Sequence, residues 1–224
     1  MPLRPRWNFE VTTSASRRTV RGSVALFAFY VIVVTLGILS MGFQLLGSRL
    51  LGPEFGSAIN VWACLISTFL AAFSAGAMIG GSVSNLPDPS RRRAQLAWAA
   101  IAVLTLAVTA FAGRLLVGRI ALAFEPGLTP VLLSCVALFF FPVMALSCFT
   151  PQCVQYLATR GTPPGKASGL VYGVSTLGNI AGVMLTAFAL IPHFRVSSLL
   201  YGWLAVAVVS LAALLRLLRE PSSP

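Results

Sequence analysis

This sequence of 224 residues is 57% hydrophobic and only 9% charged, with a mean hydropathy of +0.88. A soluble domain has about 45–50% apolar and about 25% charged residues, so the composition excludes an ordinary soluble fold. The chain has 16 Lys and Arg against 5 Asp and Glu, a net charge of +11. Because these cations fall mostly between long apolar runs, they indicate membrane topology rather than nucleic-acid binding.

Six apolar segments are long enough to cross a bilayer, whose core of about 30 Å needs roughly 20 helical residues. They are predicted at residues 24–46, 58–83, 94–117, 129–157, 168–192 and 197–218. We predict a basic N-terminal tail over residues 1–23, a six-helix transmembrane domain over 24–219 and a C-terminal tail over 220–224. The first apolar run exceeds the about 7–15 residues of a signal-peptide core, so it is expected to remain as a span. The predicted fold class is an all-α polytopic bundle.

The connectors between these segments are short and rich in Gly and Pro, as at Gly52-Pro53 and Glu125-Pro126-Gly127. Most cations lie in the N-terminal tail, in the second and fourth connectors and after the last span, which all fall on one side. Positively charged loops stay in the cytoplasm. Both termini are therefore predicted to be cytoplasmic, in a bacterial inner membrane.

Small residues recur at helical spacing in the second and fifth segments, at Gly76 and Gly80 and at Gly173, Gly178 and Gly182. In lipid, such ladders let helix backbones approach closely. We predict helix packing for these five glycines; a substrate path or a dimer face is the alternative. Since the two ladders occupy matching places, they suggest two three-helix units in inverted relation.

The fourth segment contains Pro142 and Pro151, with Ser147 and Thr150 nearby. Each proline removes a backbone donor, so a kink is predicted at each, with carbonyls that a hydroxyl, water or ligand must satisfy. A plain kink is the favoured interpretation, and a transporter site at a broken helix is the alternative. Asn179, Ser175 and Thr176 in the fifth segment are likewise predicted to bond a neighbouring helix rather than a solute.

Charged and polar residues gather at the end opposite the predicted cytoplasmic face. An arginine just inside a bilayer must snorkel or pair, so snorkelling together with structural ion pairs is the favoured interpretation, and a site for an anionic or carboxylate-bearing ligand is the alternative. The candidates are Gln44, Arg49, Glu54, Arg114 and Arg119.

The sequence lacks the residues that proton relays, metal sites and common catalytic sites require. All five acidic residues fall in predicted tails or loops, which argues against a proton relay within the membrane. The four cysteines form no CxxC pair, and His193 has no neighbouring carboxylate or second histidine. The sequence also has no phosphate-binding loop and no Ser/His/Asp constellation, so no catalytic residue, cofactor or metal is predicted.

Two stretches carry a family resemblance. Residues 38–83 combine Arg49-Leu50-Leu51, a Pro53-x-Phe55-Gly56 turn and a glycine ladder, and residues 165–196 combine Ser175-Thr176-x-Gly178 with Ile191-Pro192. They resemble the membrane domain of the bacterial fused MFS/spermidine synthase family, in which a transporter-like helical region is joined to a spermidine synthase. The resemblance implies a transporter-like bundle and a connection with polyamines.

This chain also departs from that family. Gln44 stands where family members typically have a glutamate, and Ser84-Asn85 where the second helix typically ends in an aspartate and a basic residue. The Gly-rich loop and acidic residues of the synthase half find no counterpart in the 224 residues. An aminopropyltransferase activity of this chain would therefore rest on the resemblance alone.

Three functions follow as hypotheses. The first is a non-catalytic membrane subunit or anchor, which docks a partner protein through its basic cytoplasmic face. The second is a small-solute transporter or half-transporter that works as a homo-oligomer, and the third is a component of spermidine biosynthesis. The predicted partners are the lipid bilayer and either a second protein or further copies of the chain, with no nucleic acid.

Overall fold

The computed structural model describes the backbone of residues 10–219 and the side chains of residues 24–219. Within this range six helical spans are long and apolar enough to cross a membrane, which confirms the predicted all-α six-helix bundle. The first three spans are α1 (Glu10–Phe55), α2 (Ile59–Ser84) and α3 (Asp88–Ala123). The fourth comprises α4 (Leu128–Cys135), a π-helical segment η1 (Val136–Phe140), α5 (Phe141–Ser147) and α6 (Phe149–Ala158). The fifth comprises α7 (Pro164–Met184), a second π-helical segment η2 (Leu185–Leu190) and α8 (Ile191–His193), and the sixth is α9 (Val196–Leu217).

The first helix is longer than predicted at both ends. It begins at Glu10, so residues 10–23, which were expected as a tail, continue the helix of the first span. It also passes through Pro53, where the sequence predicted a turn. The turn comes at Gly56 instead, which has φ +72° and donates its N–H to the Gly52 carbonyl at 2.9 Å. A left-handed glycine of this kind is a common end for a helix.

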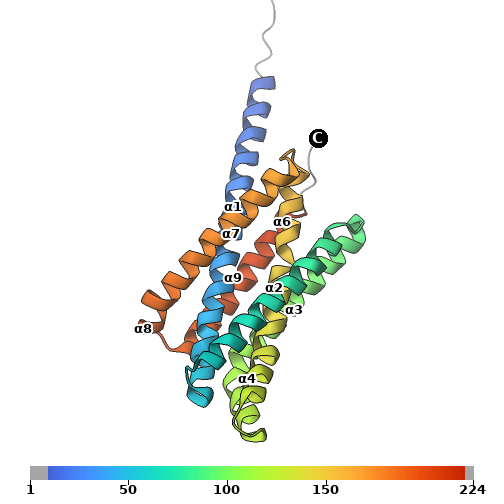
Figure 1. The fold of residues 1–224 in the computed structure, drawn as a ribbon. Coiled ribbons are helices and arrows are strands. Elements are labelled where there is room, and N and C mark those ends of the chain that lie inside the picture. Colours follow the sequence, from blue (N-terminus) through green and yellow to red (C-terminus); the bar gives the residue numbers. More distant parts are fainter. Residues whose placement is uncertain (1–9, 220–224) are drawn as a thin grey trace, which may run out of the picture.

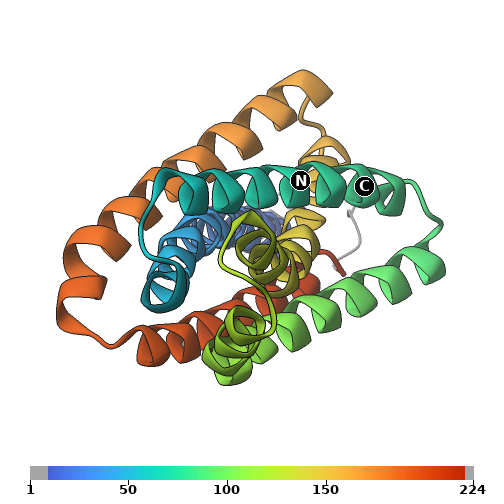
Figure 2. The same ribbon diagram turned by 60° about the horizontal axis from the view of Figure 1, so that its bottom comes forward.

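Successive spans run in opposite directions (Figure 1). The start of α1, the α2–α3 and α6–α7 connectors and the end of α9 therefore lie at one end of the bundle. This end carries Arg91, Arg92, Arg160 and Arg219, and we call it the basic end. The α1–α2, α3–α4 and α8–α9 connectors lie at the opposite end, which is turned toward the viewer in Figure 2.

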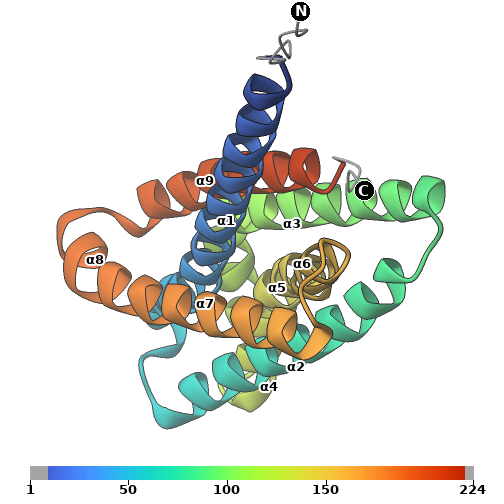
Figure 3. The ribbon, with the colours of Figure 1, turned by 90° about the horizontal axis from the view of Figure 1, so that it is seen from above.

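The first and fourth spans lie at the centre of the bundle. Seen from above, α1 lies between α7 and α9, and α5 and α6 lie between α2 and α3 (Figure 3). The fourth span is the more enclosed of the two, because 61% of its most apolar stretch is buried, against 33% in the first span. The fifth span is only 17% buried in the same measure and lies at the edge.

Both predicted kinks in the fourth span coincide with breaks in the α-helix. The π-helical segment η1 ends two residues before Pro142, and α5 gives way to α6 at Cys148, three residues before Pro151. Because Pro142 has no N–H, the Leu138 carbonyl lacks the donor that an α-helix would supply. Thr109 of α3 donates its hydroxyl to this carbonyl at 2.7 Å. A neighbouring helix therefore satisfies the backbone group that the proline leaves free.

Four of the five predicted packing glycines lie against the backbone of another span. A Cβ at Gly76 or Gly80 would meet the carbonyl groups of Met144 and Cys148 in the fourth span. A Cβ at Gly178 would lie 3.1 Å from the carbonyl carbon of Val34, and one at Gly182 would lie 2.5 Å from the Ile38 carbonyl oxygen. Helices that approach this closely leave no room for a side chain.

Gly173 is the exception. It is exposed, and nothing lies within 4 Å of a Cβ placed there. Its face of α7 points away from α1, the helix on which α7 mainly packs. The packing role predicted for Gly173 is therefore wrong within this chain.

The glycine contacts relate the two halves of the bundle to each other. In the second span, Gly76 and Gly80 are four residues apart, and they pack on the carbonyls of Met144 and Cys148, which are four residues apart in the fourth span. In the same way, Gly178 and Gly182 of the fifth span pack on the carbonyls of Val34 and Ile38 in the first span. The chain therefore consists of two three-span units with equivalent packing, and because each unit has an odd number of spans, the two units have inverted orientations.

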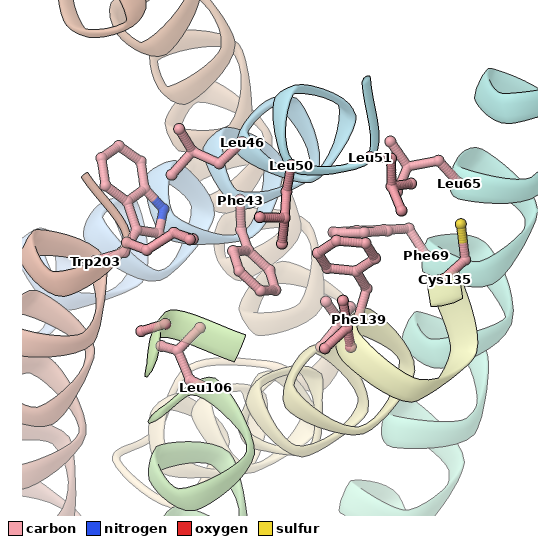
Figure 4. Packing of buried hydrophobic residues seen from close by; sticks show 14 of the residues in the cluster. Phe43, Leu46, Leu50, Leu51, Leu65, Phe69, Leu106, Cys135, Phe139 and Trp203 are labelled. Carbon is pink, nitrogen blue, oxygen red and sulfur yellow. The ribbon is translucent and has the colours of Figure 1, made fainter. Parts of the chain in front are cut away.

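The buried side chains follow the same relation. Phe29 and Val33 of the first span correspond to Phe139 and Val143 of the fourth, and all four are buried. One apolar cluster, shown in Figure 4, lies toward the opposite end and contains Phe139, whereas a second cluster toward the basic end contains Phe29. Corresponding residues of the two units, such as Phe29 and Phe139, thus lie in different clusters, one toward each end of the bundle.

Candidate functional site: a hydroxyl-lined cavity

A cavity of about 340 Å³ lies where the first, second, fourth and fifth spans meet. Its lining residues fall near the middle of these spans, so the cavity lies at mid-depth in the bundle. Its wall carries side chains that donate and accept hydrogen bonds, namely Ser40, Ser74, Ser147, Thr150, Tyr172, Ser175, Thr176 and Asn179. No charged side chain from the described part of the chain lines it.

The two inverted units contribute equivalent residues to this cavity. Ser40 of the first span corresponds to Thr150 of the fourth, and Ser74 of the second corresponds to Thr176 of the fifth. The apolar part of the wall is paired in the same way, by Leu36 and Leu146. The cavity therefore lies between the two units.

Close helix packing forms one wall of the cavity. Ser147 is buried beside Gly76, and its hydroxyl donates to the Met144 carbonyl at 3.1 Å. The same hydroxyl lies 3.4 Å from the carbonyl oxygens of Ala72 and Phe73. Ser147 thus joins the second and fourth spans directly behind the cavity.

The polar side chains of the cavity differ in whether they already have a partner. Ser40 donates to the Leu36 carbonyl at 2.9 Å, and Thr176 donates to the Tyr172 carbonyl at 2.8 Å, each within its own helix. The side chains of Ser74, Thr150, Ser175 and Asn179 form no hydrogen bond with any part of the chain that the structure describes. In lipid an unpaired amide is costly. These groups therefore require water, a solute or a second protein.

Three of these residues had a different predicted partner. Asn179, Ser175 and Thr176 were expected to bond a neighbouring helix, but no side-chain hydrogen bond of this kind is present among residues 24–219. Ser40 and Ser74 were not predicted as site residues. The signal that identifies them is the correspondence between the two units, which depends on how the spans pack and not on the sequence alone.

The five candidate residues at the opposite end do not assemble into a site. Arg49, Glu54, Arg114 and Arg119 are all exposed, Gln44 is half-buried, and no ion pair joins them within residues 24–219. Glu54 of the first span lies near the third span, since its Oε1 would lie 3.8 Å from a Cβ at Gly118. The ion pairs that were predicted here are therefore not formed among residues 24–219. Snorkelling of the arginines into the polar region at the membrane surface stays a prediction.

Cysteines and histidine do not form a reactive centre in the described part of the chain. Cys64, Cys135, Cys148 and Cys153 are buried and unpaired, and His193 bonds the Ala189 carbonyl at 2.8 Å. No group of three or more potential metal ligands occurs among the described residues. The hydroxyl and amide groups of the cavity wall are suited to non-covalent binding through hydrogen bonds.

We compared the chain with models of protein families, with curated proteins and with solved structures, and none of the three comparisons found a match.

Proposed function

We propose that this chain is a membrane carrier, or one half of a carrier, for a small, uncharged, polar solute. The observation that supports this most directly is the hydroxyl-lined cavity between the inverted units. Transporters built from inverted repeats bind their substrates near the bilayer midplane, at the interface between the repeats. The volume of about 340 Å³ falls in the usual range of small-molecule sites.

The chemistry of the wall limits the class of solute. Hydroxyl and amide groups exchange hydrogen bonds with neutral hydroxyl, amide or urea groups, whereas a bare cation or anion would need a compensating charge. The cavity offers no such charge from the described residues. A carrier for a polyamine cation is for the same reason a poorer fit than a carrier for a polyol or an amide.

Transport through this site requires the two units to move relative to each other. The backbone contacts of Gly76 with Met144 and of Gly178 with Val34 are equivalent, so the units pack symmetrically around the cavity. Rocking about such a symmetric interface would open the cavity to one end and then to the other. In this proposal the basic end faces the cytoplasm, as the distribution of cations predicts.

A second candidate is a membrane subunit that docks a partner protein. The fifth span favours it, because it is only 17% buried and has exposed large apolar side chains such as Leu177 and Phe188. Gly165, Gly169 and Gly173 have nothing within 4 Å of a Cβ placed on them. Another helix could therefore approach α7 closely. The same surface suits a second copy of a half-carrier, so assembly alone does not separate the two functions.

Solute movement in liposomes tests the carrier. The purified protein is reconstituted, and stopped-flow light scattering follows swelling with glycerol, erythritol, urea and glucose as probes. We expect faster entry of at least one probe than in protein-free liposomes. Asn179→Ala should reduce this entry about tenfold, the loss expected when one strong hydrogen bond to a bound solute is removed. Ser82→Ala is the matched control, because Ser82 is exposed, bonds Met78 within its own helix and does not line the cavity.

The possible outcomes separate the candidates. If no probe enters faster than in empty liposomes while a second protein copurifies in fixed stoichiometry, the subunit function replaces the carrier. If a probe enters rapidly but Asn179→Ala and Ser82→Ala behave alike, the solute does not use this cavity.

A further inference from the structure

A second cavity, of about 470 Å³, opens at the basic end of the bundle. It lies where the start of α3, the end of α6 and the end of α9 meet, and thus apart from the hydroxyl-lined cavity. Figure 1 shows the α2–α3 connector, the α6–α7 connector and the end of α9 at the same end of the bundle. The wall carries four arginines and one acidic residue, namely Arg91, Arg92, Arg160, Arg219 and Asp88.

Two of the arginines have contacts within this wall. Arg91 forms an ion pair with Asp88, three residues earlier on α3. The Arg160 guanidinium lies over the Tyr156 ring, 4.2 Å from its centroid. Arg92 and Arg219 are exposed, and neither has an acidic partner within the part of the chain described here. The cavity therefore has an excess of positive charge, with two guanidinium groups available to an anion.

Two buried glutamines form the deeper part of the wall. Gln152 is only 2% exposed; its Nε2 donates to the Cys148 carbonyl at 3.0 Å, while its Oε1 has no hydrogen-bond partner. Gln95 is 7% exposed, and its side chain forms no hydrogen bond with the described residues. A buried amide without a partner costs free energy, so both point to a polar occupant. An unpaired amide oxygen specifically requires a donor.

We propose that this cavity binds a phosphate-bearing ligand that also carries a hydroxyl group. Arg92 and Arg219 bind the phosphate through charge-assisted hydrogen bonds, which guanidinium groups form with paired oxygens. The hydroxyl donates to Gln152 Oε1 in the deeper part of the cavity. Such a ligand is either a soluble hydroxylated phosphate ester or the headgroup of an anionic phospholipid. The inference does not depend on the carrier function, because no solute from the hydroxyl-lined cavity takes part.

The test measures binding in two arms with purified protein in phosphatidylcholine nanodiscs. In one arm, the unfolding temperature is followed during titration with glycerol 3-phosphate, with glycerol as the uncharged control. In the other, nanodiscs contain increasing fractions of phosphatidylglycerol. We expect a saturable rise in unfolding temperature in at least one arm, and the responding arm identifies the source of the ligand.

Matched variants separate a site from a diffuse surface charge. Arg92→Gln and Arg219→Gln should each raise the half-saturating concentration about tenfold, as expected for the loss of one charge-assisted bond. Arg93→Gln and Arg216→Gln remove the same charge from exposed positions that do not line the cavity. These two variants should leave the half-saturating concentration unchanged. No response in either arm would overturn the proposal, as would equal losses in all four variants.

The hydroxyl contact has its own test in the unaltered protein. Methyl phosphate has the phosphate group but no hydroxyl, so it should bind more weakly than glycerol 3-phosphate. Gln152→Met, which preserves the length of the side chain, should reduce this difference. If the wild-type protein binds the two esters equally, the role of Gln152 is wrong.

Discussion

The hydroxyl of Thr109 in the third span donates to the carbonyl of Leu138 in the fourth, at 2.7 Å, and this is the carbonyl that Pro142 deprives of its helical donor. We expect Thr109→Val, which keeps the shape of the side chain, to destabilise the protein by about 1 kcal/mol. The fraction that remains monodisperse in size-exclusion chromatography after heating measures the change.

Two further variants locate the cause of this loss. Thr105 bonds only the carbonyls of its own helix, at Ile101 and Ala102, so Thr105→Val should cost less than Thr109→Val. Pro142→Ala restores a backbone N–H near Leu138, and Thr109→Val should then have a smaller effect in that background than in the wild type. Equal effects in both backgrounds would show that the hydroxyl does not compensate for the proline.

The glycines offer a second prediction, on stability. Gly178→Ala places a methyl group against the Val34 backbone, and Gly76→Ala places one against the Met144 backbone. Since a carbonyl cannot move aside as the tip of a side chain can, each variant should lose about 1–3 kcal/mol. Gly173→Ala is the control, because its methyl group enters open space and alanine favours the helix by about 0.5–1 kcal/mol over glycine. Its stability should therefore be unchanged or slightly higher, measured by the same heating assay.

Water in the hydroxyl-lined cavity gives a third prediction. The charged reagent MTSET modifies cysteines that meet water, but not those that face lipid. We expect it to label Thr176→Cys, whose side chain lines the cavity, and not Leu177→Cys, whose side chain is 66% exposed on the apolar surface. Mass spectrometry of the intact protein in liposomes measures the labelling. Preferential labelling of Leu177→Cys would mean that the surface identified as facing lipid instead meets water.

The sequence predicted the number and nature of the spans because apolar length alone determines which helices cross a bilayer. It also predicted the close packing at Gly76, Gly80, Gly178 and Gly182, since small residues at helical spacing let helix backbones approach closely in lipid. It could not separate Gly173 from these, because the face that a helix buries depends on its neighbours. For the same reason, Ser40, Thr150, Ser74 and Thr176 appeared as isolated hydroxyls until the inverted arrangement brought them together.

The orientation of the bundle is a fourth prediction, and it is tested with single cysteines in intact cells. Ser57 is exposed in the α1–α2 connector, and Ser90 is exposed in the first turn of α3, beside Arg91 to Arg93. Because positively charged connectors stay in the cytoplasm, an impermeant maleimide should label Ser57→Cys in intact cells and Ser90→Cys only after permeabilisation. The reverse pattern would place the basic end outside the cell, and the phosphate-bearing ligand would then have to be extracellular. Equal labelling of both positions in intact cells would contradict the second span itself, because one apolar helix, α2, is all that separates them.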